Sequence, residues 1–379
     1  LGLLSSPHFI LKGDAMEASG RFVGIDLGKR TYDMCLVEPK GKITRTNGKT
    51  DFKGIDKLCE KLGADDLVAI EACNLAMRIE RRIRQTVGCK VYILNPGKLA
   101  VIYMSTRKTD KEDALKLAKL LKNHDEDELP IVTPPTDEEW ERRKLLSEYK
   151  SLKGARTREV NKLHAIFEHA GYTQFKRKDM CCEKNRNNIL PLLKGYEKEE
   201  AERLIERLSL LEKQIEQLLQ KINAEVEKDD KVQLAMTVPG IGPITALAYV
   251  AYMGDLSRFE NPHQVSNFLG FVPKIDHSCT IKRNGHTTKN GNALLRSLLV
   301  QAAWGTVRSK DGGALRDKYK YMSGTKGMSK GKSIVTTARK LGELLYMLLK
   351  ENKSYEPQKF ITPEYHISKL ADEALAANM

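Results

Sequence analysis

Long hydrophobic runs are missing from this 379-residue sequence. A helix that crosses a membrane needs about 18 or more consecutive apolar residues, and no stretch reaches that length. The first apolar segment, LGLLSSPHFIL, lacks a basic region and is interrupted by serine and proline, so it does not match a secretory signal peptide. We therefore expect no membrane partner and a cytoplasmic location.

Paired cysteines are scarce as well. The seven cysteines are odd in number and scattered, only Cys181 and Cys182 are adjacent, and no CxxC motif occurs. This pattern argues against the disulfide framework of a small secreted domain and against a zinc ribbon. His164 and His169 lack the helical spacing of four that a metal-binding pair needs, so we expect ordinary helix residues there.

Positive charge, by contrast, is plentiful. Lysine and arginine number 64 against 50 aspartates and glutamates, which gives a formal charge of +14. Such an excess favours a polyanionic partner such as nucleic acid. The length exceeds one typical core and indicates two or three domains.

The first organised region alternates strands and helices. Residues 1–20 show no periodicity, and we expect them to be a disordered tail. Three β-like runs come next, then a helical pattern, and after it strands and helices take turns. This order predicts an α/β sheet layered with helices, as in a ribonuclease-H-like domain. The predicted segments are, in order, 21–27, 32–38, 42–47, 51–63, 66–73, 75–87, 90–95 and 106–121.

A proline-rich stretch, ELPIVTPPTDEEW, ends this region and predicts a linker. Beyond it the sequence is helical and charged, with apolar residues at alternating spacings of four and three, which is a heptad seam. Either an intramolecular helical hairpin with residues 140–170 or a contact between copies of the chain would bury it. The seam residues are Leu204, Leu208, Leu211, Ile215, Leu218 and Ile222.

A glycine turn opens the third region. Gly240 and Gly242 in TVPGIGPITALAYV precede a helical pattern. Glycine lets a backbone approach a phosphate closely, and the next helix offers free N–H groups, as in a helix-hairpin-helix contact with nucleic acid. The alternative is a tight turn between two packed helices.

Four carboxylates carry the case for metal chemistry. Asp26 and Glu71 interrupt or end apolar strand runs, where a carboxylate is costly unless it is paired or binds a cation. Asp110 and Asp113 lie three apart on one face of a predicted helix. Together the four would suit Mg²⁺ or Mn²⁺, which prefer oxygen ligands and act on phosphate esters. Alternatively, the helical aspartates belong only to a capped N-terminus, because TDKE (109–112) reads as a capping box.

A basic segment follows the glycine turn, PKIDHSCTIKRNGHTTKNGNALLR. It has one acidic residue, Asp276, and Ser278 lies inside it. The segment would suit the positioning of phosphates. A serine beside basic groups would suit phosphoryl transfer, although most serines in loops have no catalytic role. The predicted nucleic-acid contacts in this segment are Lys274, Lys282, Arg283, Lys289 and Arg296.

These motifs resemble a known family. GIDLGKRTYD, AIEAC and RKTDKEDALKLAKLL look like the DEDD motifs of transposases of the insertion sequence 110 family, relatives of the pilin-gene invertase. The TD-x-x-DA pattern is the most specific part of this first domain. The resemblance covers roughly 21–350 and implies an α/β plus all-α architecture. A RuvC-like domain (21–128) precedes a linker with coiled-coil helices (129–230) and a helical domain with a helix-hairpin-helix (231–353), and 354–379 form a tail.

The resemblance also implies a mechanism. Asp26, Glu71, Asp110 and Asp113 would bind the metal, and Ser278 would attack a DNA phosphodiester and form a transient phosphoserine link. The family's C-terminal motif is of the P-x-x-x-S-S-G type. Here its first serine is replaced by His277 and its glycine by Cys279, so Ser278 is its single serine. The implied partners are donor and target DNA, a structured bridge RNA and further copies of the chain in a dimer or tetramer. We expect a composite site to form on assembly.

Several alternatives stay open at this stage. The chain could be a site-specific DNA invertase of the same type. It could also be a metal-dependent RuvC-like nuclease or junction resolvase that uses water, or a noncatalytic nucleic-acid-binding protein. A Cys/His nucleophile built from His277 and Cys279 is a less favoured hypothesis, because the side chains of residues close in sequence often point in different directions.

Overall fold

The computed structural model describes residues 20–102, 110–278 and 281–357, with side chains described except at 100–102, 110–111 and 274–284. The expected tails, 1–20 and 354–379, lie outside this part except at residues 20 and 354–357. The chain divides between Pro134 and Pro135 into two compact units. The division falls within the proline-rich stretch. None of the described helices is long and apolar enough to cross a membrane.

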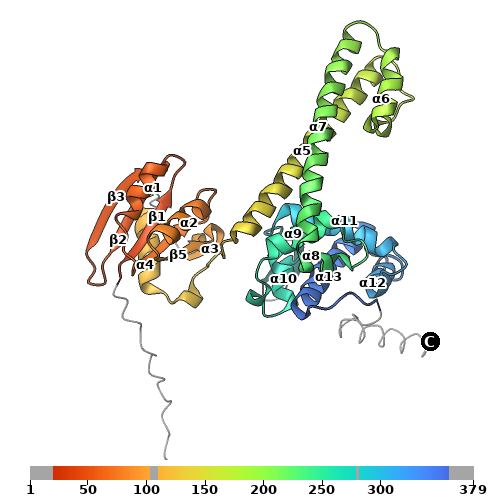
Figure 1. Cartoon of the computed structure of the whole chain (residues 1–379). Helices are drawn as coiled ribbons and strands as arrows, with labels where there is room; N and C mark the ends of the chain where they lie inside the picture. Colours follow the sequence, from red (N-terminus) through yellow and green to blue (C-terminus); the bar gives the residue numbers. More distant parts are fainter. Residues whose placement is uncertain (1–19, 103–109, 279–280, 358–379) are drawn as a thin grey trace, which may run out of the picture. The chain divides into compact units, whose positions relative to one another are not determined.

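The first unit is built on a five-stranded sheet in the order β3-β2-β1-β4-β5 (Figure 1). Its first three strands are antiparallel, whereas β1, β4 and β5 run parallel. A short turn suffices between antiparallel strands, but each parallel connection needs a crossover helix. The strands are β1 (Phe22–Leu27), β2 (Thr31–Val37), β3 (Ile43–Lys49), β4 (Leu67–Glu71) and β5 (Lys90–Leu94).

Helices cover both faces of this sheet. On one face α1 (Phe52–Cys59) and α2 (Ala76–Thr86) bury alternate strand residues such as Val23 and Ile25. On the other face, α3 (Pro96–Ile102) and α4 (Asp110–Asn123) cover Ala69 and Leu94. Alternation of side chains along each strand creates these two cores. The predicted mixed α/β region is confirmed.

Two long helices begin the second unit. A capping box, in which Thr136 and Glu139 satisfy each other's backbone N–H groups, starts α5 (Asp137–His169). α5 packs along α7 (Gly195–Glu227), and three short helices lie between them in the chain (Figure 1). These are η2 (Arg177–Cys181), α6 (Glu183–Ile189) and η3 (Leu190–Leu192).

The heptad residues are buried within the chain. Leu204 and Leu208 pack in a core with Leu163 and Phe167 of α5, and Ile222 packs in a second core with Leu146. Of the six predicted seam residues, Leu211 alone is half-buried and the rest are buried. The pairing of α5 with α7 therefore uses the seam inside one copy of the chain. His164 accompanies this pair with its Nε2 3.0 Å from the Phe175 carbonyl oxygen.

The rest of the second unit is mostly helical, as predicted, with one exception. The helices surround a core that contains Leu247, Leu299 and Leu345. The exception is a two-stranded hairpin, β6 (Pro273–Ser278) and β7 (Ile281–Thr287), in a region expected to be all-helical. The helices are α8 (Asp230–Met236), α9 (Pro243–Met253), η4 (Leu256–Arg258), α10 (Pro262–Phe268), α11 (Ala293–Arg308), α12 (Gly313–Ser323) and α13 (Lys330–Glu351), and η1 (Glu126–Glu128) lies in the first unit.

Candidate active site

Asp26 and Glu71 lie next to each other on neighbouring strands. Ile25 of β1 is paired with Ile70 of β4 in parallel register, so the residue after each stands at the same level of the sheet. Asp26 and Glu71 then point to the face opposite the two isoleucines, because side chains alternate along a strand. Both carboxylate residues are half-buried. The two strands thus bring these predicted ligands together at the carboxyl edge of the sheet.

Helix α4 packs directly on this face. A Cβ atom at Gly24 would lie 2.0 Å from the carbonyl oxygen of Ala114 and 2.6 Å from the backbone nitrogen of Ala118. Only glycine allows two backbones to come this close. At the far end of the helix, the Lys122 ammonium donates to the Pro39 carbonyl oxygen at 3.0 Å.

The contact between Lys122 and Pro39 shows in which direction α4 runs across the sheet. Pro39 follows β2 beyond Val37, and Val37 is paired with Phe22 at the start of β1. The last turn of α4 therefore lies at the amino end of β1, and its first turn lies at the carboxyl edge. That first turn contains Asp110 and Asp113. All four predicted ligand positions consequently share one edge of the sheet.

The described side chains do not form a complete set of metal ligands. The Asp113 carboxylate is half-buried and lies 2.6 Å from the Lys116 ammonium. Glu112, the other acidic residue of this turn, pairs with Arg45 of β3 at 3.3 Å. The side chain of Asp110 and all of Thr109 lie outside the described residues, and so does the predicted capping box. Among the side chains that are described, no three histidines, cysteines or carboxylates gather closely enough to hold a metal.

Sequence reasoning missed Asp33 as a member of this edge. It lies opposite Asp26 in the antiparallel pair of β1 and β2, so it faces α4. Asp33 is half-buried and lines a cleft of about 420 Å³ together with Arg45 and Ala114. Asp33 and Cys35 are two residues apart on β2, so their side chains point to the same face of the sheet, and Cys35 is buried. This alternation is the sequence signal that could have placed Asp33 on the α4 face. The cleft adjoins Asp33, whose backbone pairs with that of Asp26.

Ser278 lies at the tip of the hairpin in the second unit. It is the last residue of β6 and is paired with Ile281 of β7. The predicted contacts Lys274, Lys282 and Arg283 belong to the same two strands, and the backbone pairs Arg283 with Asp276. The hairpin therefore collects the predicted nucleophile and three basic positions on one small element. The side chains of these residues lie outside the described part.

The base of the hairpin is held by the chain itself. The Arg296 guanidinium donates to the carbonyl oxygens of Gly291 at 2.5 Å and Leu269 at 3.3 Å, and burial lowers the pKa of Arg296. A Cβ at Gly291 would lie 2.2 Å from the Phe268 carbonyl oxygen. Lys289 has a positive φ of 57° and donates its N–H to Gly270. These contacts give Arg296 and Gly291 a structural role at this junction.

The two glycines of the turn between α8 and α9 have different surroundings. Gly240 has a φ of +92°, and a Cβ there would lie 2.5 Å from the Ala302 carbonyl oxygen of α11. Its glycine is therefore required by packing within the chain. Gly242 precedes α9 as its N-cap, and no atom of the described residues lies within 4 Å of its Cβ position. Of the two predicted glycine contacts, Gly242 is the one with open space.

Two family profiles match this sequence. Residues 23–171 match the DEDD domain of IS110 elements, described as "Transposase", and residues 232–320 match the domain described as "Transposase IS116/IS110/IS902 family". The first match contains all four carboxylates and the sheet apart from Phe22. The second contains the glycine turn, the hairpin and Ser278.

Known proteins are similar over most of the chain. The transposase for insertion sequence element IS1111A of Coxiella burnetii is 23% identical over 346 residues, which covers 88% of this chain and 91% of that protein. The pilin gene-inverting protein of Moraxella bovis is 24% identical over 348 residues, covering 89% and 98% respectively. A probable family 20 transposase of Pseudomonas aeruginosa is 26% identical over 299 residues, covering 76% and 84%.

Proposed function

Because this chain belongs to the IS110 family of transposases, we propose that it cuts and exchanges DNA strands with four carboxylates and a serine nucleophile. The observation that supports this most is the in-register placement of Asp26 and Glu71 at the edge where α4 begins. The sheet with this carboxyl edge is the core of the proposed ribonuclease-H-like, RuvC-like domain.

The proposed metal ligands are Asp26, Glu71, Asp110 and Asp113, and the DEDD domain match indicates divalent-metal dependence. Their oxygens are the donors that Mg²⁺ and Mn²⁺ prefer. When bound, the metal would supply positive charge that polarises a phosphate and stabilises the leaving oxygen. The four carboxylates would hold this charge at the carboxyl edge of the sheet.

The proposed nucleophile is the Ser278 hydroxyl. Its oxygen attacks a phosphodiester phosphorus and loses its proton to a base, a new oxygen–phosphorus bond forms, and the bond to one nucleoside oxygen breaks. That oxygen leaves as a free hydroxyl after taking up a proton. A hydroxyl of the exchanged strand then attacks the phosphoserine and releases Ser278. The phosphoester bond is kept throughout, which is the advantage of covalent catalysis.

We further propose that a structured bridge RNA guides the reaction and that the composite site forms in a dimer or tetramer. The family resemblance and the net positive charge support these partners. Inversion of a DNA segment is the second candidate, because relatives named pilin gene-inverting proteins match over 98% of their length. Inversion would use the same residues on two sites of one DNA molecule.

The test uses labelled DNA from the flanking element, RNA transcribed from it, and the full chain. The parent should cut the DNA in the presence of Mg²⁺ and leave a covalent protein–DNA adduct on a denaturing gel. Ser278→Ala should lose both products, and Asp26→Asn should lose both as well. As a matched control, Ser323→Ala removes a hydroxyl that, among the described residues, bonds only the Tyr319 carbonyl of α12, and it should behave like the parent. Cutting by Ser278→Ala would instead identify a nuclease that uses water.

A further inference from the structure

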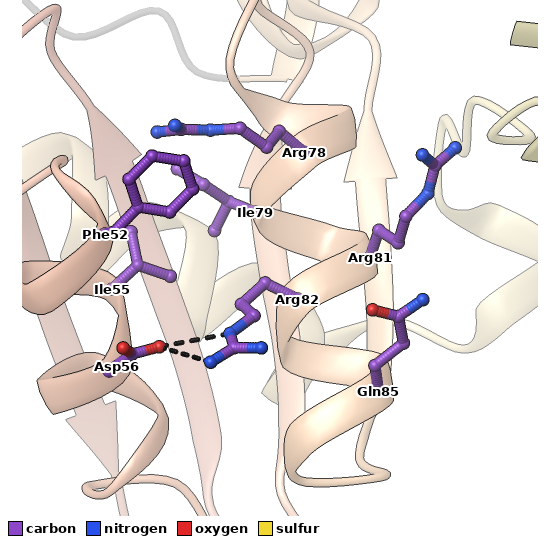
Figure 2. Close-up of a pocket in the computed structure, with 8 residues that line it drawn as sticks. All are labelled: Phe52, Ile55, Asp56, Arg78, Ile79, Arg81, Arg82 and Gln85. Carbon is purple, nitrogen blue, oxygen red and sulfur yellow. Dashed lines mark hydrogen bonds and ion pairs between the residues drawn. The ribbon is translucent and has the colours of Figure 1, made fainter. Parts of the chain in front are cut away.

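A phenylalanine at the start of α1 is exposed to an unusual degree. The Phe52 side chain is 79% exposed, the largest value among the exposed large hydrophobic residues of the described chain. It borders a groove of about 190 Å³ between α1 and α2, whose floor includes Ile55 and Ile79 (Figure 2). This volume is below the ~300–1,000 Å³ of an ordinary small-molecule pocket, so it suits one flat group rather than a whole ligand.

An arginine accompanies the exposed ring. The Arg78 guanidinium lies 5.4 Å from the centroid of the Phe52 ring and donates to the Thr50 carbonyl oxygen at 2.7 Å. Figure 2 shows the two side chains side by side across the groove, one from each helix. Arg78 is thereby held in place beside one face of the ring. An aromatic ring flanked by a fixed guanidinium is the usual platform for an unpaired base.

Basic residues from a second segment adjoin this platform. The turn between β1 and β2 contains Lys29 and Arg30, both exposed. Thr50 ties this turn to the platform, because its hydroxyl donates to the Lys29 carbonyl oxygen at 3.1 Å and its N–H donates to that of Arg30 at 3.0 Å. Lys49 and Lys53, on either side of Phe52 in the sequence, are exposed as well.

The acidic residues nearby are already engaged. Asp51 accepts a hydrogen bond from the Gly54 N–H at 2.7 Å and caps α1. Asp56 accepts from the Arg82 guanidinium at 2.7 Å, as the dashed lines of Figure 2 mark. Lys29, Arg30, Lys49 and Lys53 have no ion pair with any described residue. The surface around Phe52 therefore carries a positive charge without a partner in the described chain.

We propose that Phe52 and Arg78 form a stacking platform for an unpaired base of single-stranded DNA, with Lys29, Arg30 and Lys53 on the neighbouring phosphates. An exposed aromatic ring alone would suit an apolar peptide, but the positive surroundings favour a polyanion. Duplex DNA is disfavoured because its bases are stacked on each other and cannot reach the ring.

The platform adjoins the carboxyl edge of the sheet. The turn with Lys29 and Arg30 begins directly after β1, the strand that ends with Asp26 and Leu27. A strand held on this surface is therefore close in the fold to the carboxylates. The choice of DNA rests on the proposed function, since strand cleavage and exchange leave DNA unpaired.

The experiment measures binding without cleavage. Fluorescence anisotropy in EDTA follows the full chain with a labelled DNA strand of about 16 nucleotides, its RNA counterpart and the duplex. Phe52→Ala and Phe52→Leu should weaken single-stranded DNA binding about ten-fold, whereas Phe52→Trp should restore it, because stacking needs a ring. Duplex affinity should not change. Replacing Lys29 and Arg30 by glutamine should lower the salt slope by roughly 0.7 per lost phosphate contact.

The chain offers a matched control. Tyr196 is 71% exposed and has the Arg203 guanidinium 5.4 Å from its ring centroid, but it is followed by Glu197, Glu199 and Glu200. Tyr196→Ala should leave DNA binding unchanged. Parent-like binding by Phe52→Leu, or equal loss with duplex DNA, would overturn the platform. A loss confined to RNA would overturn the choice of DNA. If Asp26→Asn binds single-stranded DNA like the parent but does not cleave, the platform stands apart from the catalytic site. If Phe52→Ala binds single-stranded DNA weakly but still cleaves, the proposed function stands apart from the platform.

Discussion

Gly24 of β1 touches the backbone of α4 at Ala114. A methyl group at Gly24 would lie 2.0 Å from the Ala114 carbonyl oxygen, which no real packing tolerates. Asp110 and Asp113 belong to α4, and Asp26 belongs to β1. This contact therefore determines how far Asp110 and Asp113 lie from the strand that contains Asp26. Gly24 therefore acts on the candidate site through the helix it supports.

Gly24→Ala should push α4 away from β1 and destabilise the first unit by about 1–3 kcal/mol, the usual cost of overpacking. It should also reduce metal-dependent cleavage more than the stability loss explains. Thermal unfolding and a cleavage assay well below the melting temperature measure the two effects. Gly63→Ala is the control, since its nearest neighbour would be the Asp66 carboxylate at an ordinary 3.8 Å. Normal cleavage by Gly24→Ala would contradict the proposed support.

Two neighbouring carboxylates of α4 should separate metal binding from structure. Asp113→Asn should abolish metal-dependent cleavage while the fold stays intact. Glu112→Gln loses a half-exposed pair with Arg45, which contributes about 0–1 kcal/mol, so cleavage should persist. Calorimetric titration with Mn²⁺ and a Mg²⁺-dependent cleavage assay provide the measurements. If both variants cleave like the parent, Asp113 is not a ligand.

The carboxylate edge was predictable because two apolar strand runs each end in a carboxylate. Asp26 and Glu71 each follow a buried apolar run, and parallel strands bring such ends to one edge. Asp33 was not assigned to the edge because its partner depends on the register of β1 with β2. That register is set by the turn in which the Gly28 N–H bonds the Thr31 carbonyl oxygen, a detail that periodicity does not show.

The hairpin was missed for a different reason. Its residues are polar on both strands, so no buried face marks it, although Ile275, Ile281 and the Asn284-Gly285 pair are poor helix formers. The partners of Gly240 and Arg296 were equally hidden. Both contact backbone atoms far along the chain, and a sequence pattern does not show whether a glycine or an arginine serves a phosphate or the chain's own carbonyl groups.

Arg296 should behave as a structural residue first. Arg296→Gln removes two hydrogen bonds to the carbonyl groups of Leu269 and Gly291, which should cost about 1–3 kcal/mol. Unfolding by urea measures the loss. Arg308→Gln on the same helix is the control, because that exposed guanidinium lies over the Trp304 ring, and the stability of the variant should change little. Unchanged stability of Arg296→Gln together with weaker DNA binding would restore the phosphate role.

The Glu212 carboxylate neutralises a fully buried arginine in the second unit. Its oxygens lie 2.7 Å from Arg186, which is 0% exposed, and 2.8 Å from Arg156. Glu212→Ala leaves Arg186 buried without this partner and should cost about 3–5 kcal/mol. Glu216→Ala, one turn later on an exposed face, should cost little. Chemical denaturation followed by circular dichroism compares the two variants.

The same carboxylate predicts a pH dependence. Burial alone would raise the pKa of Glu212, but hydrogen bonds from Arg186 and Arg156 outweigh burial and hold it below its ordinary value. A lowered pKa in the folded state means that the stabilisation is present above about pH 4.3 and is lost as the pH falls further. The stability gap between the parent and Glu212→Gln should therefore narrow below that pH. A constant gap would assign the effect to packing.

Leu208 and Leu210 test where the heptad seam of α7 is buried. Leu208 is 0% exposed against α5, whereas Leu210 is 57% exposed two residues later. Leu208→Ala should cost about 2–5 kcal/mol in the free energy of unfolding, because it leaves a cavity between the two helices. Leu210→Ala should cost almost nothing, and its oligomeric state by light scattering should match the parent. If Leu210→Ala instead dissociates an oligomer, α7 pairs with another copy through its exposed face while the seam stays closed within each chain.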